Sequence, residues 1–231
     1  MYIHLNMNKE NIKEVARRAI EFIVDTIAPP SPDVRRIERM TVEEFISKAL
    51  QTDVREHIED IQAFLPYRAD VVRCAIVEIK DRPNKKIARL LGKVLYEFLR
   101  GELEDLRAFE NFTRPVIIPV PITKKKKRKR GWNQCELILD GLAKVDRGHI
   151  FEIRNDVLEK IKETDDQVGK TKEERHLNVK GSFAPRDRRV ARGRNIIIFD
   201  DIVTTGATLR EAKKALIDAG ARRVICVALA H

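Results

Sequence analysis

Two carboxylates and a cluster of threonines lie close together near the end of the chain, in the segment Asn195–Leu209. The segment begins with the apolar run 195–199, which predicts a buried strand. Asp200 and Asp201 follow directly, and after a short turn the apolar spacing of 207–219 predicts a helix. Ligands of open α/β sheets bind at the carboxyl ends of strands, so these side chains are the first candidates for chemistry.

The turn that joins this strand to its helix is suited to a phosphate group. It comprises Thr204, Thr205, Gly206, Ala207 and Thr208. A helix N-terminus offers unpaired N–H groups, glycine permits close backbone approach, and threonine hydroxyls add donors. The two carboxylates only accept hydrogen bonds, so beside a phosphate they need hydroxyl donors or a cation. A ribose diol next to a 5-phosphate would satisfy both halves; the alternative is a purely structural acidic turn and a Thr-capped helix.

The strongest charge feature is an uninterrupted basic run in a chain whose formal net charge is +10. The run comprises Lys124, Lys125, Lys126, Lys127, Arg128, Lys129 and Arg130. Such a run is typical of a solvated, disordered loop, and it also fits the unspecific pattern of a nuclear-localisation signal. A positive chain suits a polyanionic partner, which is either nucleic acid or a small ligand dense in phosphate.

The remaining composition narrows the class of protein. Cys74, Cys135 and Cys226 are far apart and odd in number, and the histidines are scattered, so we expect neither a disulfide framework nor bound zinc. A Walker A loop and a dinucleotide-binding glycine fingerprint are absent. No apolar stretch approaches the roughly 18 residues that cross a bilayer, and Met1–Glu10 lacks the order of a signal peptide. We therefore expect a cytoplasmic protein.

Helices are predicted for the first part of the chain. The apolar spacing over 11–27 gives one helical stripe. Thr41, with Glu44 three residues later, forms a capping box that begins a second helix, and a further helix is expected over 53–64. These segments carry no plausible chemistry, so we interpret residues 1–65 as a helical N-terminal extension.

Residues 66–231 have the pattern of an α/β domain. A short helix is predicted over 71–79, where periodicity alone leaves a strand open, and a longer helix over 87–99, ended by Gly101. Short apolar runs and helical stretches then alternate. Strands are expected at 115–120, 156–161, 195–199 and 223–230, and helices at 133–144 and 207–219. Strand–helix–strand units with apolar strands predict a parallel sheet that is covered on both faces.

Three further stretches accompany the acidic segment. They are Ile118-Pro119-Val120-Pro121 with Arg130-Gly131-Trp132-Asn133-Gln134 after the basic run; Thr164-x-x-Gln167 with Arg175-x-x-Asn178 and Gly181-Ser182-Phe183; and Lys80 before Asp81-Arg82-Pro83. Together with the Asp-Asp and Thr-Thr-Gly segment, they resemble the ComF family of competence-related proteins among the type I phosphoribosyltransferases. The resemblance covers about residues 66–230, and it implies a type I phosphoribosyltransferase-like parallel sheet flanked by helices.

The resemblance also implies a site for 5-phosphoribosyl 1-pyrophosphate and Mg²⁺, with the ion held mainly through the ligand. Asp200 and Asp201 would hold the ribose hydroxyls, and residues 204–208 would bind the 5-phosphate. The pyrophosphate loop and its border would comprise Pro121, Ile122, Thr123, Arg130 and Asn133, next to the basic run. A lid would include Lys160, Lys162, Thr164, Gln167, Arg175 and Asn178. Arg175 could instead brace its loop, and Trp132 is expected to be a packing anchor.

The chain departs from the family pattern in two places. Many family members begin with a cysteine-rich zinc ribbon, and Phe22–Pro32 resembles the lead-in to it without its cysteines. Lys160 and Lys162 stand where members often have arginine, which keeps the charge but loses bidentate phosphate geometry.

Three functions stay open at this point. The resemblance implies transfer of the phosphoribosyl group to an unknown acceptor with release of pyrophosphate. Alternatively, the protein is a single-stranded-DNA-binding factor in DNA uptake that works with other competence proteins and has a regulatory, non-catalytic ligand site. The third is a ligand sensor without catalysis.

Overall fold

The main sheet of the protein is parallel throughout, as the sequence predicts. A computed structural model describes residues 29–52, 58–163 and 178–231. The strand order is β1-β7-β6-β2-β3, and every pairing in this sheet is parallel. The strands are β1 (Ile61–Leu65), β2 (Val116–Pro119), β3 (Glu152–Ile153), β6 (Asn195–Ile202) and β7 (Arg223–Ala230). This arrangement confirms an α/β fold of the phosphoribosyltransferase-like kind.

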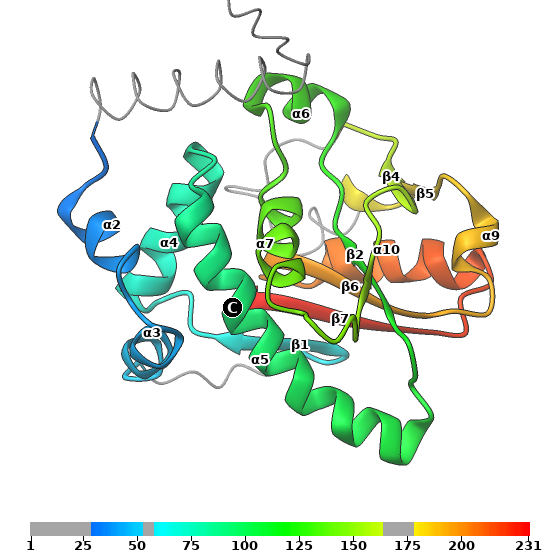
Figure 1. Cartoon of the computed structure of the whole chain (residues 1–231). Helices are drawn as coiled ribbons and strands as arrows, with labels where there is room; N and C mark the ends of the chain where they lie inside the picture. Colours follow the sequence, from blue (N-terminus) through cyan, green and yellow to red (C-terminus); the bar gives the residue numbers. More distant parts are fainter. Residues whose placement is uncertain (1–28, 53–57, 164–177) are drawn as a thin grey trace, which may run out of the picture.

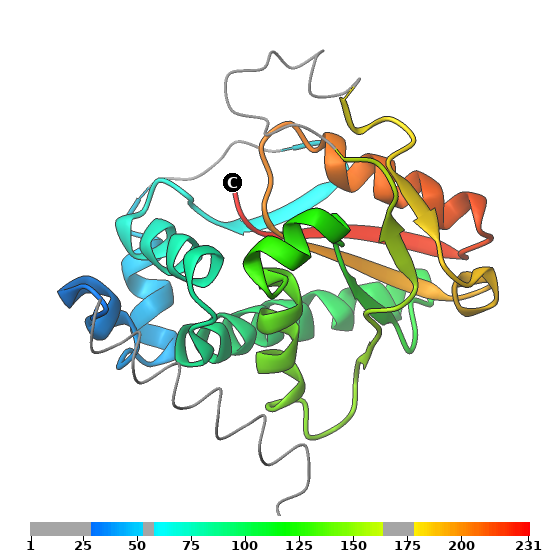
Figure 2. The same cartoon turned by 90° about the horizontal axis from the view of Figure 1, so that it is seen from above.

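Helices cover the two faces of the sheet because the side chains of its central strand alternate between two buried clusters. Ile197 and Phe199 belong to the larger cluster, whereas Ile196 and Ile198 belong to the smaller one. On the larger-cluster side pack α4 (Asp70–Asp81), α5 (Lys85–Glu110) and α7 (Gln134–Ala143). On the other lie α10 (Ala207–Asp218) and the antiparallel pair β4 (Leu158–Lys160) and β5 (Phe183–Pro185) (Figures 1 and 2).

The first described helices join this core rather than forming a separate unit. They are α2 (Pro32–Ile37) and α3 (Val42–Ala49). Phe45 of α3 is fully buried in the larger cluster. The predicted capping box is confirmed, because the Thr41 hydroxyl accepts from the Glu44 N–H while the Glu44 carboxylate accepts from the Thr41 N–H. The helix predicted over 11–27 lies outside the described residues.

The helix predicted over 53–64 is wrong where the structure describes it. Residues 61–65 form β1, which pairs with β7 at the edge of the sheet, Ile61 opposite Cys226. A short apolar segment does not by itself distinguish a strand from a helix, and here pairing with β7 decides. The expected division at residue 66 leaves this strand outside the domain, whereas the structure places it in the sheet.

Gly101 does not end the long helix either. Helix α5 continues to Glu110, and Asn111 ends it in the left-handed conformation, with φ of 51°. The helix passes Gly101 because Leu103, one turn beyond Leu99 on the same face, is also buried in the core. Despite its length α5 is too rich in charge to span a bilayer, and no other helix in the described ranges could span one.

Two shorter predictions need adjustment. The strand expected over 156–161 is β4, but it pairs antiparallel with β5 instead of entering the main sheet. The basic run is not a loop, because it forms α6 (Lys124–Arg130). Thr123 caps this helix by accepting from the Lys126 N–H, and Gly131 closes it with φ of 91°. The remaining short helix is α9 (Arg188–Ala191).

Candidate functional site

The candidate site lies at the carboxyl ends of β2 and β6. These strands are neighbours, with Pro119 opposite Phe199, so the loop after β2 and the acidic end of β6 meet at one edge of the sheet. The N-terminus of α10 is at the same edge, because the turn from β6 is short. The fold therefore brings together three parts of the chain, as expected from parallel topology. They are the turn 204–208, called the phosphate turn below after its expected role, the two aspartates and the loop 121–123.

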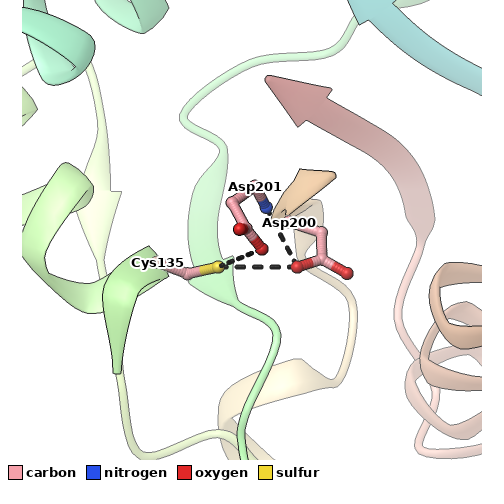
Figure 3. Close-up of side chains that lie close together, drawn as sticks. All are labelled: Cys135, Asp200 and Asp201. Carbon is pink, nitrogen blue, oxygen red and sulfur yellow. Dashed lines mark hydrogen bonds between the residues drawn. The ribbon is translucent and has the colours of Figure 1, made fainter. Parts of the chain in front are cut away.

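Asp200 and Asp201 lie close together but in different surroundings (Figure 3). The side chain of Asp201 is only 4% exposed, whereas Asp200 is partly exposed. The Asp201 N–H donates to Asp200 Oδ1 at 2.9 Å, and Cys135 Sγ lies 3.5 Å from that same oxygen. Cys135 Sγ is also 4.0 Å from Asp201 Oδ1. Asp200 is therefore the carboxylate that a ligand could reach.

Asp201 is held by partners from two helices on the larger-cluster side. Lys80 Nζ of α4 lies 2.7 Å from Asp201 Oδ2, and Gln134 Nε2 of α7 donates to Oδ1 at 3.2 Å. Gln134 in turn accepts from Arg130 Nη1 at 2.7 Å, which links the last residue of α6 to the acidic pair. The carboxylate of Asp201 is thus engaged on both oxygens.

The surroundings shift the pKa values of Asp200 and Asp201 in opposite directions. Burial and the negative charge of Asp201 raise the pKa of Asp200. Burial alone would raise the pKa of Asp201 too, but the Lys80 ammonium lowers it below its usual value. Burial would likewise lower the pKa of Lys80, yet Asp201 raises it, so both members of this ion pair stay charged. Burial and the aspartates raise the pKa of the Cys135 thiol well above its usual value, so this residue is an S–H donor.

The phosphate turn has the backbone form that the sequence predicts. Gly206 has φ of 76° and is the N-cap of α10. The positive φ favours glycine here, and a Cβ would lie 2.5 Å from Ile61 Cδ1 of β1, so the end of that side chain would have to shift. Thr204 is exposed, while Thr205 and Thr208 are half-buried. The Ala207 N–H reaches Thr205 Oγ1 at 3.4 Å.

Arg210 braces this turn from within α10. Its Nη1 donates to the Thr205 carbonyl at 2.8 Å, and its Nη2 donates to the Glu59 carbonyl at 3.2 Å. Sequence reasoning gave this residue no role. The turn is therefore tied to the lead-in of β1, and the guanidinium adds positive charge beside the N-terminus of α10.

Two residues expected at the pyrophosphate loop, Asn133 and Thr123, stabilise the local structure. Asn133 is buried, donates to the Val120 carbonyl at 3.0 Å and accepts from the Cys135 N–H at 3.0 Å. Thr123 is also buried and caps α6. Pro121 and Ile122 remain half-buried at the edge of the site. Asn133 and Thr123 thus shape the loop from inside.

Trp132 is the packing anchor that the sequence suggests. Its indole N–H donates to the Ile79 carbonyl at 2.8 Å, which fastens the segment between α6 and α7 to α4.

The basic helix α6 presents its charges to solvent. Lys124, Lys125, Lys126, Lys127, Arg128 and Lys129 are all exposed. Lys127 forms an ion pair with Glu136 at 2.9 Å, and Arg130 turns inward to Gln134. The helix is therefore an exposed cationic surface whose last residue contacts the acidic pair through one glutamine.

Of the expected lid, the structure describes only its two ends. Lys160 is half-buried with its Nζ 5.5 Å from the centre of the Phe183 ring, and burial and nearby Lys126 lower its pKa. Lys162 donates to the Lys180 carbonyl at 3.1 Å, and Asn178 is half-buried. Thr164, Gln167 and Arg175 lie outside the described residues.

Lys80, Gln134, Cys135 and Arg210 complete the site, although none was assigned a role from sequence. Lys80 and Gln134 belong to stretches that carry the family resemblance, but their spacing gives no sign of a contact with the aspartates. Only packing shows it.

Comparison with known proteins agrees with this geometry. Residues 138–231 match the family model of the phosphoribosyl transferase domain. The chain is similar to Competence protein ComFC of Bacillus subtilis (strain 168), with 29% identity over 52% of this chain and 50% of that protein. It is also similar to Competence protein F of Haemophilus influenzae, with 29% identity over 60% of this chain and 58% of that protein.

A third relative, Competence protein ComFC of Streptococcus pneumoniae, is 28% identical over 79% of this chain and 78% of its own length. The chain spans about half the length of the first two relatives. The chain is thus similar to competence proteins of the ComF family, and its residues 138–231 match a phosphoribosyl transferase domain, in agreement with the parallel sheet.

Proposed function

We propose that this protein binds 5-phosphoribosyl 1-pyrophosphate at the carboxyl edge of β6 and transfers its phosphoribosyl group to an acceptor, releasing pyrophosphate. The observation that carries the proposal is the juxtaposition of a reachable carboxylate, Asp200, with a glycine turn at the N-terminus of α10. Asp200 would accept hydrogen bonds from the ribose hydroxyls. The turn 204–208 would receive the 5-phosphate.

The turn is equipped for a dianion in three ways. Gly206 caps α10 without a side chain of its own, and the Ala207 N–H only reaches Thr205 Oγ1 at 3.4 Å, so the N-terminus of the helix can face an anion. Thr204 and Thr208 can add hydroxyl donors. The guanidinium of Arg210 holds the turn in place and contributes positive potential at short range.

The pyrophosphate end of the ligand would lie between the loop after β2 and the lysines beyond it. Lys126 and Lys160 are close enough for the charge of Lys126 to lower the pKa of Lys160, after the larger effect of burial, and Asp200 also influences it. Two neighbouring cations favour an anionic group at this place. Catalysis would come from holding C1 of the ribose in position and from stabilising the departing pyrophosphate.

The donor set of the site fits Mg²⁺ that arrives with the ligand. Mg²⁺ prefers oxygen ligands and keeps several from water and substrate phosphates. The protein offers the Asp200 carboxylate, while Asp201 is engaged by Lys80 and Cys135 carries a protonated thiol. When bound, the ion would supply positive charge to the pyrophosphate oxygens.

We further propose that the protein is cytoplasmic and that it holds no structural zinc. Elemental analysis would test the proposal about zinc.

A second candidate function is binding of single-stranded DNA in natural competence, with the ligand site regulatory. The observation that favours it is the exposed cationic surface of α6, together with the relatives named as competence proteins. The helix offers charge without aromatic side chains, so contact with the nucleic-acid backbone is expected rather than base stacking. Other competence proteins would then be partners.

Titration calorimetry with 5-phosphoribosyl 1-pyrophosphate and Mg²⁺ tests the shared premise of both candidates. Ribose 5-phosphate, which lacks the pyrophosphate, is the matched weaker ligand. A search by mass spectrometry for ribosylated products, together with a pyrophosphate assay, then separates the two. Binding with pyrophosphate release supports the transferase, whereas binding without turnover of any metabolite in a mixture supports the regulatory site. Absence of binding refutes the ligand assignment.

A further inference from the structure

A half-buried lysine reaches the acidic pair from a helix far away in the sequence. Lys80 lies near the end of α4, and its Nζ is 2.7 Å from Asp201 Oδ2. The Asp201 side chain is 4% exposed and that of Lys80 is 29% exposed. Gln134 occupies the other oxygen of Asp201 at 3.2 Å. The pair is therefore an interior contact and not a surface ion pair.

The ammonium group binds one member of a cluster whose spacing would suit a metal ion. Single ligand atoms of Asp200, Asp201 and Cys135 all lie within 4.8 Å of one another, which is the spacing of a small cation site. Figure 3 shows these three side chains converging from the end of β6 and the start of α7. Lys80 contributes the positive charge that such a cluster requires.

Fastening α4 to the sheet does not account for this pair. Helix α4 already buries Val72, Ala75, Ile76 and Ile79, and Trp132 ties its end to the segment before α7. Removing two charges from water is expensive, and a buried ion pair is often no more stabilising than apolar residues of similar volume. A role in arranging the site explains the pair better than stability does.

We propose that Lys80 is a positioning residue that serves as the resident cation of the site. It holds Asp201 in the interior, leaves Asp200 as the single carboxylate for the ribose hydroxyls, and keeps a divalent ion from binding directly to the pair. The statement about Asp200 rests on the proposed function, whereas the exclusion of a metal ion concerns the ligand-free protein alone.

The first experiment uses Mn²⁺ alone, without any sugar phosphate. Mn²⁺ binding is measured by electron paramagnetic resonance on the wild type, Lys80→Met, Lys80→Arg and the neutral pair Lys80→Met with Asp201→Asn. We expect Lys80→Met to bind Mn²⁺ at least ten times more tightly than the wild type. Lys80→Arg retains the charge and should show no gain, and the neutral pair should lose the gain. An unchanged affinity in folded Lys80→Met overturns the exclusion of metal.

The second experiment compares the neutral pair with Asp200→Asn in calorimetric titrations with 5-phosphoribosyl 1-pyrophosphate and Mg²⁺. The neutral pair leaves no uncompensated charge, so it is expected to fold even if Lys80→Met alone does not. It should lose less affinity than Asp200→Asn, because it removes the residues that position Asp200 but keeps the Asp200 carboxylate, whereas Asp200→Asn should lose at least tenfold. An equal loss in both variants would show that Asp201 contacts the ligand and would overturn the proposal.

The outcome of the Mn²⁺ experiment does not depend on whether the sugar phosphate binds. A wild type that does not bind the sugar phosphate refutes the proposed function, and the Mn²⁺ comparison then still decides whether Lys80 excludes a metal ion.

Discussion

The acidic pair at the end of β6 and the basic helix α6 place their charged side chains in opposite environments. At the end of β6, Asp201 is buried and engaged by Lys80 and Gln134, and Asp200 accepts from a backbone N–H. On α6, six consecutive cationic side chains face solvent, and Lys127 has an ion pair with Glu136. Buried charges interact strongly and specifically, whereas exposed ones are screened by salt and act together.

The difference in burial indicates which kind of ligand each region can bind. A site with assigned partners selects one small ligand by geometry, and a single substitution there should have a large effect. An exposed cationic helix attracts any polyanion, and each of its charges should contribute a little. The regions also touch, because Arg130 of α6 donates to Gln134, which donates to Asp201.

Glycine substitutions offer the sharpest comparison, since each region ends in a glycine with positive φ. Gly206 has φ of 76° and Gly131 has φ of 91°. A Cβ at Gly206 would lie 2.5 Å from Ile61 Cδ1, but none would meet an atom within 4 Å at Gly131. We expect Gly131→Ala to lower the free energy of unfolding by about 1 kcal/mol through conformational strain. Gly206→Ala should lower it somewhat more, by about 2 kcal/mol, because the end of the Ile61 side chain must also shift.

Urea unfolding of both variants measures this difference. Equal losses at the two positions would show that the Ile61 side chain moves aside at no cost and would contradict the expected difference.

Replacement of the reachable carboxylate should weaken ligand binding without affecting α6. Asp200→Asn removes a charged acceptor, and such a hydrogen bond contributes about 1.5–3 kcal/mol, which corresponds to roughly a tenfold to hundredfold loss of affinity. Binding of single-stranded DNA should be unchanged. Calorimetry and a DNA-binding assay on the same preparation check both expectations, with the exposed Asp140→Asn as the matched control. Loss of DNA binding in Asp200→Asn would show that the two regions share one ligand.

The acidic pair should also make ligand binding depend on pH. The pKa of Asp200 is raised, chiefly by burial and then by Asp201, so this carboxylate takes up its proton at a higher pH than an ordinary aspartate. The ribose hydroxyls require the ionised form, so affinity should fall as the pH decreases, beginning above the usual aspartate range near about 4. The neutral pair Lys80→Met with Asp201→Asn removes both the Asp201 carboxylate, which raises the pKa of Asp200, and the Lys80 ammonium, which lowers it. Because the effect of Asp201 is the larger, the fall should then begin at lower pH.

Affinity measured across this pH range gives the test, and Asp200→Asn should lose the acid-side decrease that belongs to the protein. A decrease that is identical in wild type and Asp200→Asn would arise from the ligand and would remove Asp200 from the explanation.

The exposed helix should show the smallest effect per residue. Lys125, Arg128 and Lys129 are exposed on α6, whereas Lys127 already pairs with Glu136. Changing these three to alanine should flatten the salt dependence of single-stranded DNA binding by about 0.7 for each DNA phosphate that the helix no longer neutralises. Binding of the sugar phosphate should change little. Salt titrations of the variant and of Lys214→Ala, an exposed lysine on α10, provide the comparison. An unchanged slope excludes α6 as the region that binds DNA, and a collapse of sugar-phosphate binding assigns its charges to pyrophosphate.

Much of the site region was predictable because it is encoded locally. The apolar run before Asp200, the small residues around Gly206 and the helical spacing after Ala207 specify a strand, a turn and a helix within a few residues of one another. The capping box at Thr41 was equally predictable, since its two hydrogen bonds join residues three apart. Local sequence failed at residues 61–65 and at Gly101, where a distant strand and a continuing apolar face outweighed the local signals.

Local sequence patterns were thus enough to predict a parallel α/β domain, a tight turn of small residues at a strand end and a cationic segment. Only the tertiary structure decided that Asp201 faces Lys80 and Gln134, that Arg210 and Ile61 hold the turn, and that the basic run is an exposed helix. The reason is physical. Propensity and capping act within a few residues, but burial and charge pairing depend on which distant elements pack together, and these set the properties of a site.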